Sequence, residues 1–493
     1  MNTMIMHTLD TLSFDNSYTE LPEHFYQRVS PTPLKSPYLI SLNTEVARLL
    51  SLDPCDLTPE RLAEVFAGHE SLPGADPIAM KYTGHQFGVY NPDLGDGRGL
   101  LLGEVINEQG ERLDLHLKGA GKTPFSRFGD GRAVLRSSIR EYLVSEAMHG
   151  LGIPTTRALC LVGSEELAMR DGRMEPCATV LRVTPCHVRF GHFEYFYYSR
   201  RHDDLKVLAD YCLERYFPDC LQQDNPYLAM FKEVTARTAK LVAQWQGYGF
   251  VHAVLNTDNM SLIGETFDYG PYSFMDSYKP NTISNQNDHK GRYAFAQQPA
   301  VVHWNLACLA QTLLTLVDKE ALVAVLDSYP AQYEQAFLDL MRQRLGLLTA
   351  EESDTQLVED LLQLFTQQAV DMNRFFRRLN GFDGSEDSLT KLMQLLQNPA
   401  ALNDWLLRYE QRLTRQPQSH AERAEQMNQV NPEFILRNYM AQEAISAATE
   451  GDFTLVNDLL SLLRNPSEPN KQYAYYAESP PDWAGAICLT CSS

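Results

Sequence analysis

The alternation of apolar and polar residues predicts a strand-rich region in the first half of the chain. In segment 112–118, leucine at every second position alternates with Asp, His and Lys, which is the period of a β-strand with one apolar and one polar face. Lys118 ends this segment on the polar face, just before a glycine turn. The same reasoning predicts strands at 100–106, 157–162 and 178–183 and an amphipathic helix at 133–150.

From residue 201 onward the apolar residues recur at helical spacing instead. Helices are predicted at 228–245, 304–317, 330–347, 356–379, 388–406 and 433–448. The first 75 residues are interrupted by prolines and predict an extended, turn-rich leader with one short helix at 59–67. The end of the chain is rich in Pro and Tyr, which favours little order.

These patterns predict an α+β fold divided into four segments. An N-terminal extension covers 1–79, a strand-rich lobe covers 80–200, a mainly helical lobe covers 201–467, and a flexible tail covers 468–493. A chain of 493 residues is long enough to bury a large core in such lobes.

The net charge and the N-terminal composition limit the classes of partner and the cellular compartment that we expect. The chain has 42 Lys and Arg against 63 Asp and Glu, a net charge of −21. This excludes a general nucleic-acid or anionic-membrane binder, because such surfaces need clustered cations. Residues 1–20 contain no Lys or Arg, and the nine cysteines are mostly scattered. We therefore expect a cytoplasmic protein without a signal segment, a membrane span or a disulfide framework.

Segment 252–270 contains the closest grouping of candidate functional side chains in the sequence. Asn256, Asp258, Asn259 and Asp268 fall within 13 positions, separated by apolar residues. Carboxylate and amide oxygens in such a layout can hold a hard divalent cation beside nucleotide phosphates. The segment is similar to the catalytic loop and the metal-binding Asp-aromatic-Gly of protein kinases, although the spacing differs. The alternative is an Asx-rich turn between two buried segments.

Candidate cations lie upstream of this segment. Lys118 is followed 23 residues later by Glu141, in mid-helix, and a strand Lys held by a helix Glu is how kinase-like lobes aim an ammonium at phosphates. Arg182 and Arg189 suit bidentate phosphate binding because guanidinium groups are planar and keep their charge. Unrelated surface charges or structural salt bridges are the alternatives.

Glycine turns and a cysteine pair add weaker signals. The turn from Gly119 to Thr123 is not a Walker A motif, because His116 stands where that motif needs its first glycine. Backbone N–H groups at 95–99 and at 130–131 are candidates to face phosphate oxygens. Cys488 and Cys491 have the spacing of a redox pair, but no thioredoxin-like pattern surrounds them.

Longer motifs resemble those of the selenoprotein O family, pseudokinase-like enzymes that transfer AMP from ATP to protein hydroxyls. The resemblance covers nearly the whole chain. It is carried by His116-Leu-Lys-Gly-Ala-Gly121, Thr123-Pro124 with Ser126-Arg127, Gly129-Asp-Gly-Arg-Ala-Val-Leu-Arg136, Ile139-Arg-Glu141, His187-Val-Arg-Phe-Gly-His-Phe193, Asn256-Thr-Asp-Asn-Met-Ser261, Asp268-Tyr-Gly-Pro271 and Asn431-Pro432 with Leu436-Arg-Asn-Tyr439.

The resemblance implies a two-lobed, protein-kinase-like fold that binds ATP in a reversed orientation, with the α-phosphate facing the acceptor. It implies the following roles: Lys118, Arg182 and Arg189 bind the phosphates, Glu141 positions Lys118, Gly95, Gly97, Arg98, Asp130 and Gly131 line the nucleotide site, Asn259 and Asp268 hold Mg²⁺, and Asp258 accepts the hydroxyl proton. Some members end in Cys-x-x-selenocysteine, where this chain has Cys491.

The expected function is therefore Mg²⁺-dependent transfer of AMP to Ser, Thr or Tyr of protein substrates, with Mn²⁺ and UTP as alternatives to Mg²⁺ and ATP. Three rival functions fit parts of the pattern. A kinase would transfer the γ-phosphate, and an inactive pseudokinase scaffold would only bind nucleotide, as the altered residue order after His252 allows. A thiol oxidoreductase would use Cys488 and Cys491.

Overall fold

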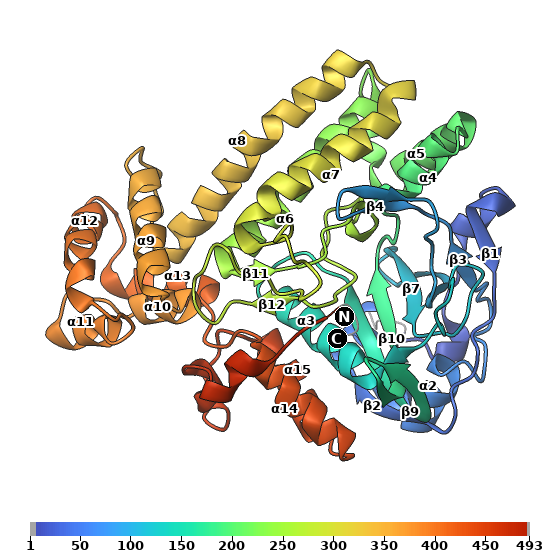
Figure 1. The fold of residues 1–493 in the computed structure, drawn as a ribbon, viewed down its shortest axis with the longest axis horizontal. Helices are drawn as coiled ribbons and strands as arrows, with labels where there is room; N and C mark the ends of the chain where they lie inside the picture. The colour runs from blue at the N-terminus through green and yellow to red at the C-terminus, as the bar shows by residue number, and fades with distance from the viewer. Residues whose placement is uncertain (1–5, 491–493) are drawn as a thin grey trace.

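The alternating leucines of segment 112–118 lie in strand β7 (Arg112–Lys118), in the middle of an antiparallel sheet (Figure 1). The computed structural model describes residues 6–490, and within them the sheet has the strand order β1-β3-β6-β7-β10-β9-β2, with β8 paired to β10. The other strands of this sheet are β1 (Tyr26–Arg28), β2 (Pro37–Leu42), β3 (Ile78–Met80), β6 (Gly99–Ile106), β8 (Ala133–Val134), β9 (Arg157–Arg170) and β10 (Arg173–Thr184).

Both faces of β7 are buried, which the alternation alone does not reveal. Its leucines pack in one apolar cluster with residues of α1 (Thr44–Leu49) and α2 (Pro59–Phe66). Helix α3 (Leu135–Gly150) packs against β9 and β10 and reaches β7 through the contact of Glu141 with Lys118. The side chains of the polar face are buried as well, and Lys118 is only 5% exposed. The polar face is therefore an interior surface that needs charge partners.

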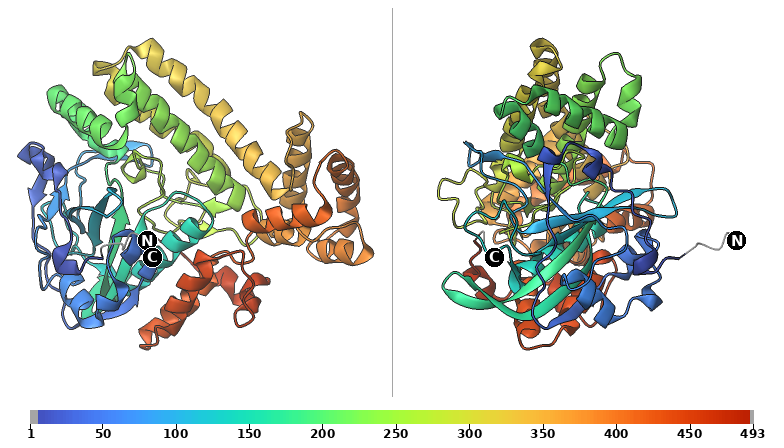
Figure 2. Two further views of the ribbon diagram at one scale, coloured as in Figure 1. Left: turned by 180° about the vertical axis from the view of Figure 1, so that it is seen from behind. Right: turned by 90° about the vertical axis from the view of Figure 1, so that its right-hand side faces the viewer.

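The second half of the chain is helical, as predicted. The long helices α6 (Pro226–Tyr248) and α8 (Lys319–Arg344) pack against each other, and α9 to α13, residues 354–430, lie at the far end of the molecule from the sheet (Figures 1 and 2). The last two helices, α14 and α15, return to the sheet side and pack against α3. The helices are α4 (Phe190–Tyr198), α5 (His202–Tyr216), α6 (Pro226–Tyr248), α7 (Gln298–Thr312), α8 (Lys319–Arg344), α9 (Asp354–Gln368), α10 (Met372–Leu379), α11 (Glu386–Met393), α12 (Asn403–Leu413), α13 (His420–Val430), α14 (Asn438–Thr449) and α15 (Thr454–Arg464).

Two short two-stranded ribbons complete the regular structure. Strands β4 (Gly84–Gln86) and β5 (Val89–Asn91) form a hairpin, and β11 (Phe250–Val251) pairs with β12 (Ser273–Phe274). The second ribbon brackets the polar segment 252–270 and brings its two ends together.

The α+β class is confirmed, and the predicted leader is only partly right. The short helix at 59–67 is present as α2, but β1 and β2 add strands to the main sheet rather than forming an extended leader. Their hydrogen bonds are made with strands far away in the sequence, so local pattern does not identify them. The Tyr-rich tail packs as well, and Tyr476 and Leu489 are buried within the part of the tail that the structure describes.

Several helix boundaries also differ from prediction. The predicted helix 356–379 is split into α9 and α10, because Ala369 adopts a left-handed φ of 49° and Asp371 accepts a hydrogen bond from the N–H of Arg374, which caps α10. The predicted helix 388–406 is split into α11 and α12, and Pro330 lies inside α8 rather than at its start. Helices α1, α4, α5, α13 and α15 were not predicted. Among residues 6–490, no helix combines the length and apolarity that crossing a bilayer requires.

Arg344 provides a test of how the helical part is held together. This buried side chain at the end of α8 donates to Asn431 Oδ1 at 2.9 Å, to Asn373 Oδ1 at 3.0 Å and to the carbonyl of Gly247, and it stacks over Phe376. We expect Arg344→Met to lower the free energy of unfolding by about 2–3 kcal/mol, because three buried acceptors lose their donor. Urea unfolding followed by tryptophan fluorescence measures the change.

The matched control is Arg48→Met, which removes an exposed guanidinium whose single ion-pair partner among residues 6–490 is Glu45 within α1. That loss is expected to cost less than about 1 kcal/mol. Equal effects of the two substitutions would contradict the structural role of Arg344.

Candidate active site

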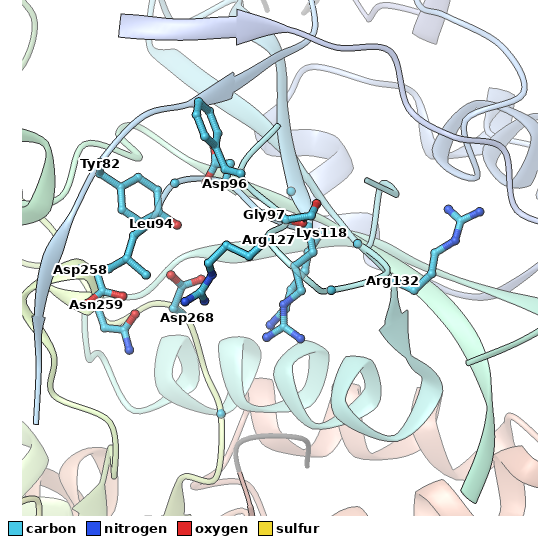
Figure 3. A pocket seen from close by; sticks show the side chains of 18 of the residues that line it. Tyr82, Leu94, Asp96, Gly97, Lys118, Arg127, Arg132, Asp258, Asn259 and Asp268 are labelled. Carbon is cyan, nitrogen blue, oxygen red and sulfur yellow. The ribbon is translucent and has the colours of Figure 1, made fainter. Parts of the chain in front are cut away.

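A cavity of about 610 Å³ brings the two halves of the chain together (Figure 3). Its walls come from the ends of β7 and β10, from glycine turns at 94–99 and 125–132, and from segment 254–271. Eleven of the residues that the sequence predicts for the site line it: Gly95, Gly97, Arg98, Lys118, Asp130, Gly131, Arg182, Arg189, Asp258, Asn259 and Asp268. Glu141 lies behind this lining, Cys488 is not part of it, and Cys491 lies outside the described residues.

Glu141 binds two cations on the side of the cavity that the sheet forms. From α3 its carboxylate accepts hydrogen bonds from Lys118 on β7 and from Arg182 on β10. Burial lowers the pKa of Lys118 to about 8, with a further contribution from the charge of Arg182, while Glu141 opposes the shift. Burial alone would raise the pKa of Glu141, but the two cations lower it, so this carboxyl is ionised. The predicted Lys–Glu pairing is therefore present, and it also includes an arginine.

Asp268 connects the sheet side to the polar segment. Its Oδ1 lies 2.7 Å from Arg182 Nη2, and its other oxygen accepts a hydrogen bond from Arg189 at the start of α4. Burial would raise the pKa of Asp268, but Arg189, Arg182 and Lys118 hold it well below its usual range. The residue adopts a left-handed φ of 55°, which is uncommon for a residue other than glycine and is frequent at functional sites.

Arg189 is fixed from several sides. Its Nη1 donates to the carbonyl oxygen of Asp258 at 2.8 Å, and its guanidinium lies between two aromatic rings, with Cζ 4.5 Å from the Tyr82 centroid and 4.6 Å from that of Phe267. Stacked and hydrogen-bonded, the guanidinium has little freedom to leave the cavity.

Asp258 lies in a short 3₁₀ turn, Thr257–Asn259, with its carboxyl group buried. Oδ2 accepts a hydrogen bond from Gln86 Nε2 at 3.2 Å, while Oδ1 is buried without a hydrogen-bond partner among the described residues. Gly84 makes room for this carboxyl, since a Cβ there would lie 2.7 Å from Oδ1. Burial raises the pKa of Asp258 to about 7, and the charge of Arg189 opposes that shift. A carboxyl with such a pKa can accept a proton near neutral pH.

The oxygen atoms around the turn fit a divalent cation. Asn259 Nδ2 donates to the carbonyl of Val254 at 2.9 Å, which leaves the amide oxygen available as a ligand. The carboxylate of Asp268 and the unpartnered Oδ1 of Asp258 line the same cavity. Carboxylate and amide oxygens are the donors that hard cations such as Mg²⁺ and Mn²⁺ prefer.

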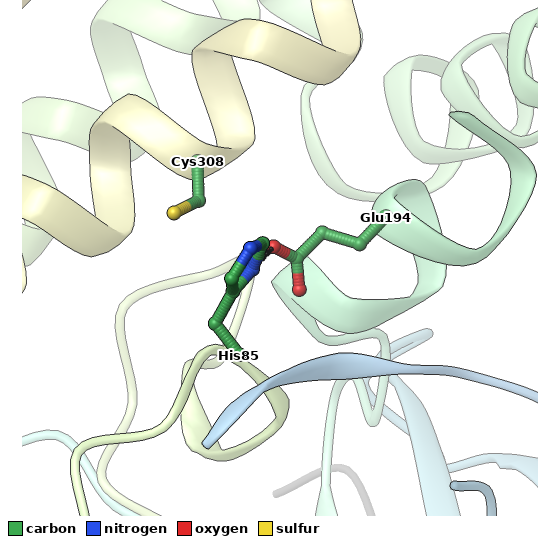
Figure 4. Close-up of side chains that lie close together, drawn as sticks. All are labelled: His85, Glu194 and Cys308. Atoms are coloured by element: carbon green, nitrogen blue, oxygen red, sulfur yellow. Dashed lines mark hydrogen bonds and ion pairs between the residues drawn. The ribbon is translucent and has the colours of Figure 1, made fainter. Parts of the chain in front are cut away.

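A second group of possible metal ligands supports the turn from behind (Figure 4). Glu194 on α4 is buried, and its two oxygens accept hydrogen bonds from His85 Nδ1 and Thr257 Oγ1, both at 2.5 Å. Burial, with the charge of Glu194, raises the pKa of the nearby Cys308 thiol to about 12. Because both carboxylate oxygens are already hydrogen-bonded and the thiol is protonated, we interpret this cluster as a support for the turn rather than a metal centre.

Sequence reasoning missed the β4–β5 hairpin and the residues that it adds. The backbone N–H of His85 donates to Thr257 Oγ1 at 2.7 Å and that of Phe87 donates to Asn256 Oδ1 at 3.3 Å, so the hairpin covers the 257–259 turn. The run Gly84-His-Gln-Phe-Gly88 shows neither helical nor strand periodicity. Its two glycines and adjacent polar side chains were the only local signal.

The shared role of Asp268 gives a prediction for the ligand-free protein. We expect Asp268→Ala to fold but to lose about 2 kcal/mol of stability, because Arg182 and Arg189 are left without the carboxylate that they share. Adding sulfate should restore part of the melting temperature by supplying a replacement anion. Asp360→Ala, which removes a half-buried partner of the exposed Arg408 side chain, should change the melting temperature little and should not respond to sulfate. A sulfate response of equal size in both variants would contradict this assignment.

Comparison with known proteins identifies relatives over the full length. Residues 8–464 match the family model described as Protein adenylyltransferase SelO. A protein of Hahella chejuensis (strain KCTC 2396), named Protein nucleotidyltransferase YdiU, is 59% identical over 489 residues, covering 99% of both chains. The proteins of that name from Ectopseudomonas mendocina (strain ymp) and Pseudomonas putida (strain GB-1) are 50% and 49% identical, covering 99% of this chain and 100% of theirs. These matches confirm the resemblance seen in the sequence motifs, and the chain belongs to the protein adenylyltransferase SelO family.

Proposed function

We propose that this protein transfers AMP from ATP to a Ser, Thr or Tyr hydroxyl of protein substrates and releases pyrophosphate. The proposal rests on one observation. Buried cations from the sheet, Lys118 and Arg182, converge on the same cavity as the carboxyl groups of Asp258 and Asp268. Membership of the family and the full-length likeness to proteins named nucleotidyltransferases support the same reaction class.

In this proposal the chain is organised as a kinase-like enzyme. Residues 80–200 act as the N-terminal lobe and residues 201–467 as the C-terminal lobe, with the extension 1–79 and the tail 468–493 attached to them. The pair Lys118–Glu141, formed between a strand and the helix that packs on it, supports this assignment. So does the Asp-Tyr-Gly sequence at Asp268, which faces that pair across the cavity.

The proposal assigns roles to the remaining residues, and their placement supports these roles. Lys118, Arg182 and Arg189 bind phosphate oxygens, and Glu141 keeps Lys118 and Arg182 in position. The second wall of the nucleotide site consists of glycine turns and their neighbours: Gly95, Gly97, Arg98, Asp130 and Gly131. Asn259 and Asp268 hold Mg²⁺ or Mn²⁺, and the metal supplies positive charge beside the phosphates when it is bound.

Asp258 accepts the proton in the proposed reaction. The hydroxyl oxygen of the substrate forms a bond to the α-phosphorus, while the bond from that phosphorus to the oxygen bridging to the β-phosphate breaks. Asp258 takes the hydroxyl proton, and pyrophosphate leaves with the bonding electron pair. The raised pKa of about 7 and the unpartnered Oδ1 suit Asp258 for this role. The hydrogen bond from Gln86 holds the other carboxyl oxygen in place.

Labelled ATP distinguishes this reaction from its rivals. Incubation of the protein with a mixture of candidate protein substrates, Mg²⁺ and α-³²P-ATP should transfer label to protein, whereas γ-³²P-ATP should not. Transfer from the γ-position alone would establish a kinase. Binding of ATP without transfer from either position, tested with Mn²⁺ and with UTP as well, would indicate a scaffold and would refute the proposal.

Asp258→Asn tests the proton acceptor. We expect this substitution to slow AMP transfer by about 10²–10⁴-fold, the usual contribution of a general base. ATP binding, measured by isothermal titration calorimetry, should remain within a fewfold, because the substituted side chain keeps its shape. As a control, Cys488→Ser removes an exposed thiol outside the cavity lining and should leave transfer unchanged. Full activity of Asp258→Asn would remove Asp258 from the mechanism.

A further inference from the structure

Ion pairs already engage most of the cations around the cavity. In the buried wall of the cavity, Lys118, Arg182 and Arg189 pair with the carboxylates of Glu141 and Asp268. The carboxylate of Asp96 lies 3.8 Å from Arg189 and adds a further negative charge. The two other paired cations of the cavity lining are Arg132, which pairs with Glu166, and Arg170, which pairs with Asp130, both at 2.7 Å. The buried cavity wall therefore carries little surplus positive charge.

Two cavity-lining arginines differ from these. Arg98 and Arg127 are exposed, and the side chain of neither makes a hydrogen bond or an ion pair with any residue in the described range 6–490. A triphosphate remains an anion even with a divalent metal bound, so its binding requires cations beyond those that the protein neutralises itself. The two unpaired guanidinium groups can supply this additional positive charge. Arg98 is already part of the proposed nucleotide site, whereas Arg127 has no role in it so far.

The backbone around Arg127 is held in a defined shape. Thr123 Oγ1 donates to the carbonyl of Asp96 at 2.6 Å, and Ser126 Oγ donates to that of Gly97 at 2.5 Å, which ties the 123–131 loop to the 94–99 glycine turn. Arg127 itself has a left-handed φ of 51°. A fixed backbone in an uncommon conformation, bearing a long unpaired side chain, places that cation at the cavity (Figure 3).

The location of this loop indicates which phosphates it faces. The loop and the glycine turn form the wall on the sheet side, while Asp258 and Asp268 belong to the wall formed by segment 254–271. If the α-phosphate faces Asp258, as in the proposed function, the β- and γ-phosphates extend toward the loop. We propose that Arg127 binds the β- and γ-phosphates of ATP and stabilises the pyrophosphate as it leaves. This inference rests on the proposed function for the identity of the leaving group.

Binding of the isolated leaving group tests Arg127 without turnover. Titration calorimetry with inorganic pyrophosphate in EDTA should show a dissociation constant at least tenfold higher for Arg127→Asn than for the unsubstituted protein. Asn tolerates the left-handed conformation, so the loop should keep its shape. Arg127→Lys should recover part of the affinity, because it keeps the charge but loses the planar fork. The affinity for AMP should not change in either variant.

The matched control is Lys122→Asn, which removes an exposed cation from the same stretch of chain that does not line the cavity. Equal pyrophosphate affinity in Arg127→Asn and the unsubstituted protein, or an equal loss in Lys122→Asn, would overturn the inference. Absence of pyrophosphate binding by the unsubstituted protein would overturn it as well.

Steady-state kinetics separate this inference from the proposed function. With α-³²P-ATP, Arg127→Asn should lower kcat by about 100-fold, as removal of one group that stabilises developing charge does, and should raise KM for ATP less. If the unsubstituted protein transfers no α-label, the proposed function fails, whatever the binding data show. If it transfers α-label and Arg127→Asn retains its kcat and its pyrophosphate affinity, only the role of Arg127 fails.

Discussion

The cavity depends on two carboxylates, the buried Glu141 and the half-buried Asp268, that hold three buried cations in place. Removing charged groups from water costs several kcal/mol for each ion, and this cost is offset only by close partners of opposite charge. Glu141 forms ion pairs with Lys118 and Arg182, and Asp268 forms ion pairs with Arg182 and Arg189. Because Arg182 is shared, the two carboxylates form one continuous network across the sheet and segment 254–271. The network is therefore both the reason that the cations remain in the interior and the link between the two halves of the molecule.

This network prepares the cavity for an anion before any ligand enters. The guanidinium of Arg189 is already stacked between Tyr82 and Phe267, so phosphate binding does not require the side chain to be ordered. The carboxylate of Asp268, however, is shared between two arginines in the ligand-free protein. In the proposed complex the arginines exchange part of this contact for phosphate oxygens, and Asp268 exchanges it for a metal. Opposite charges are redistributed among partners, and no charge is left unpaired in the interior.

Sequence reasoning identified most of the residues that line this cavity, because their charged side chains stand at positions that local periodicity assigns to strands and helices. Alternation placed Lys118 on the polar face of a strand, and helical spacing placed Glu141 in mid-helix. The burial of that polar face was not predictable, since it depends on where α3 packs. Gln86 and Glu194 were missed because the contacts that define them join elements about 60 to 170 residues apart. The strands β1 and β2 were not predicted for the same reason. Helices α9 and α10 were predicted as one helix, because the apolar pattern continues across Ala369, the left-handed residue that separates them.

The altered residue spacing of segment 252–270 has a geometric explanation. Kinases separate the catalytic Asp from the metal-binding Asn along the chain, whereas here Asp258 and Asn259 are adjacent. They lie in a 3₁₀ turn, in which neighbouring side chains diverge by about 120°. Asp258 accordingly meets Gln86 of the hairpin, and Asn259 is bonded back to Val254 on its own segment. Two adjacent residues can therefore face different partners, and the roles proposed for them, proton acceptor and metal ligand, need no intervening residues. The hairpin makes this arrangement stable, because Thr257 is bonded both to His85 and to Glu194.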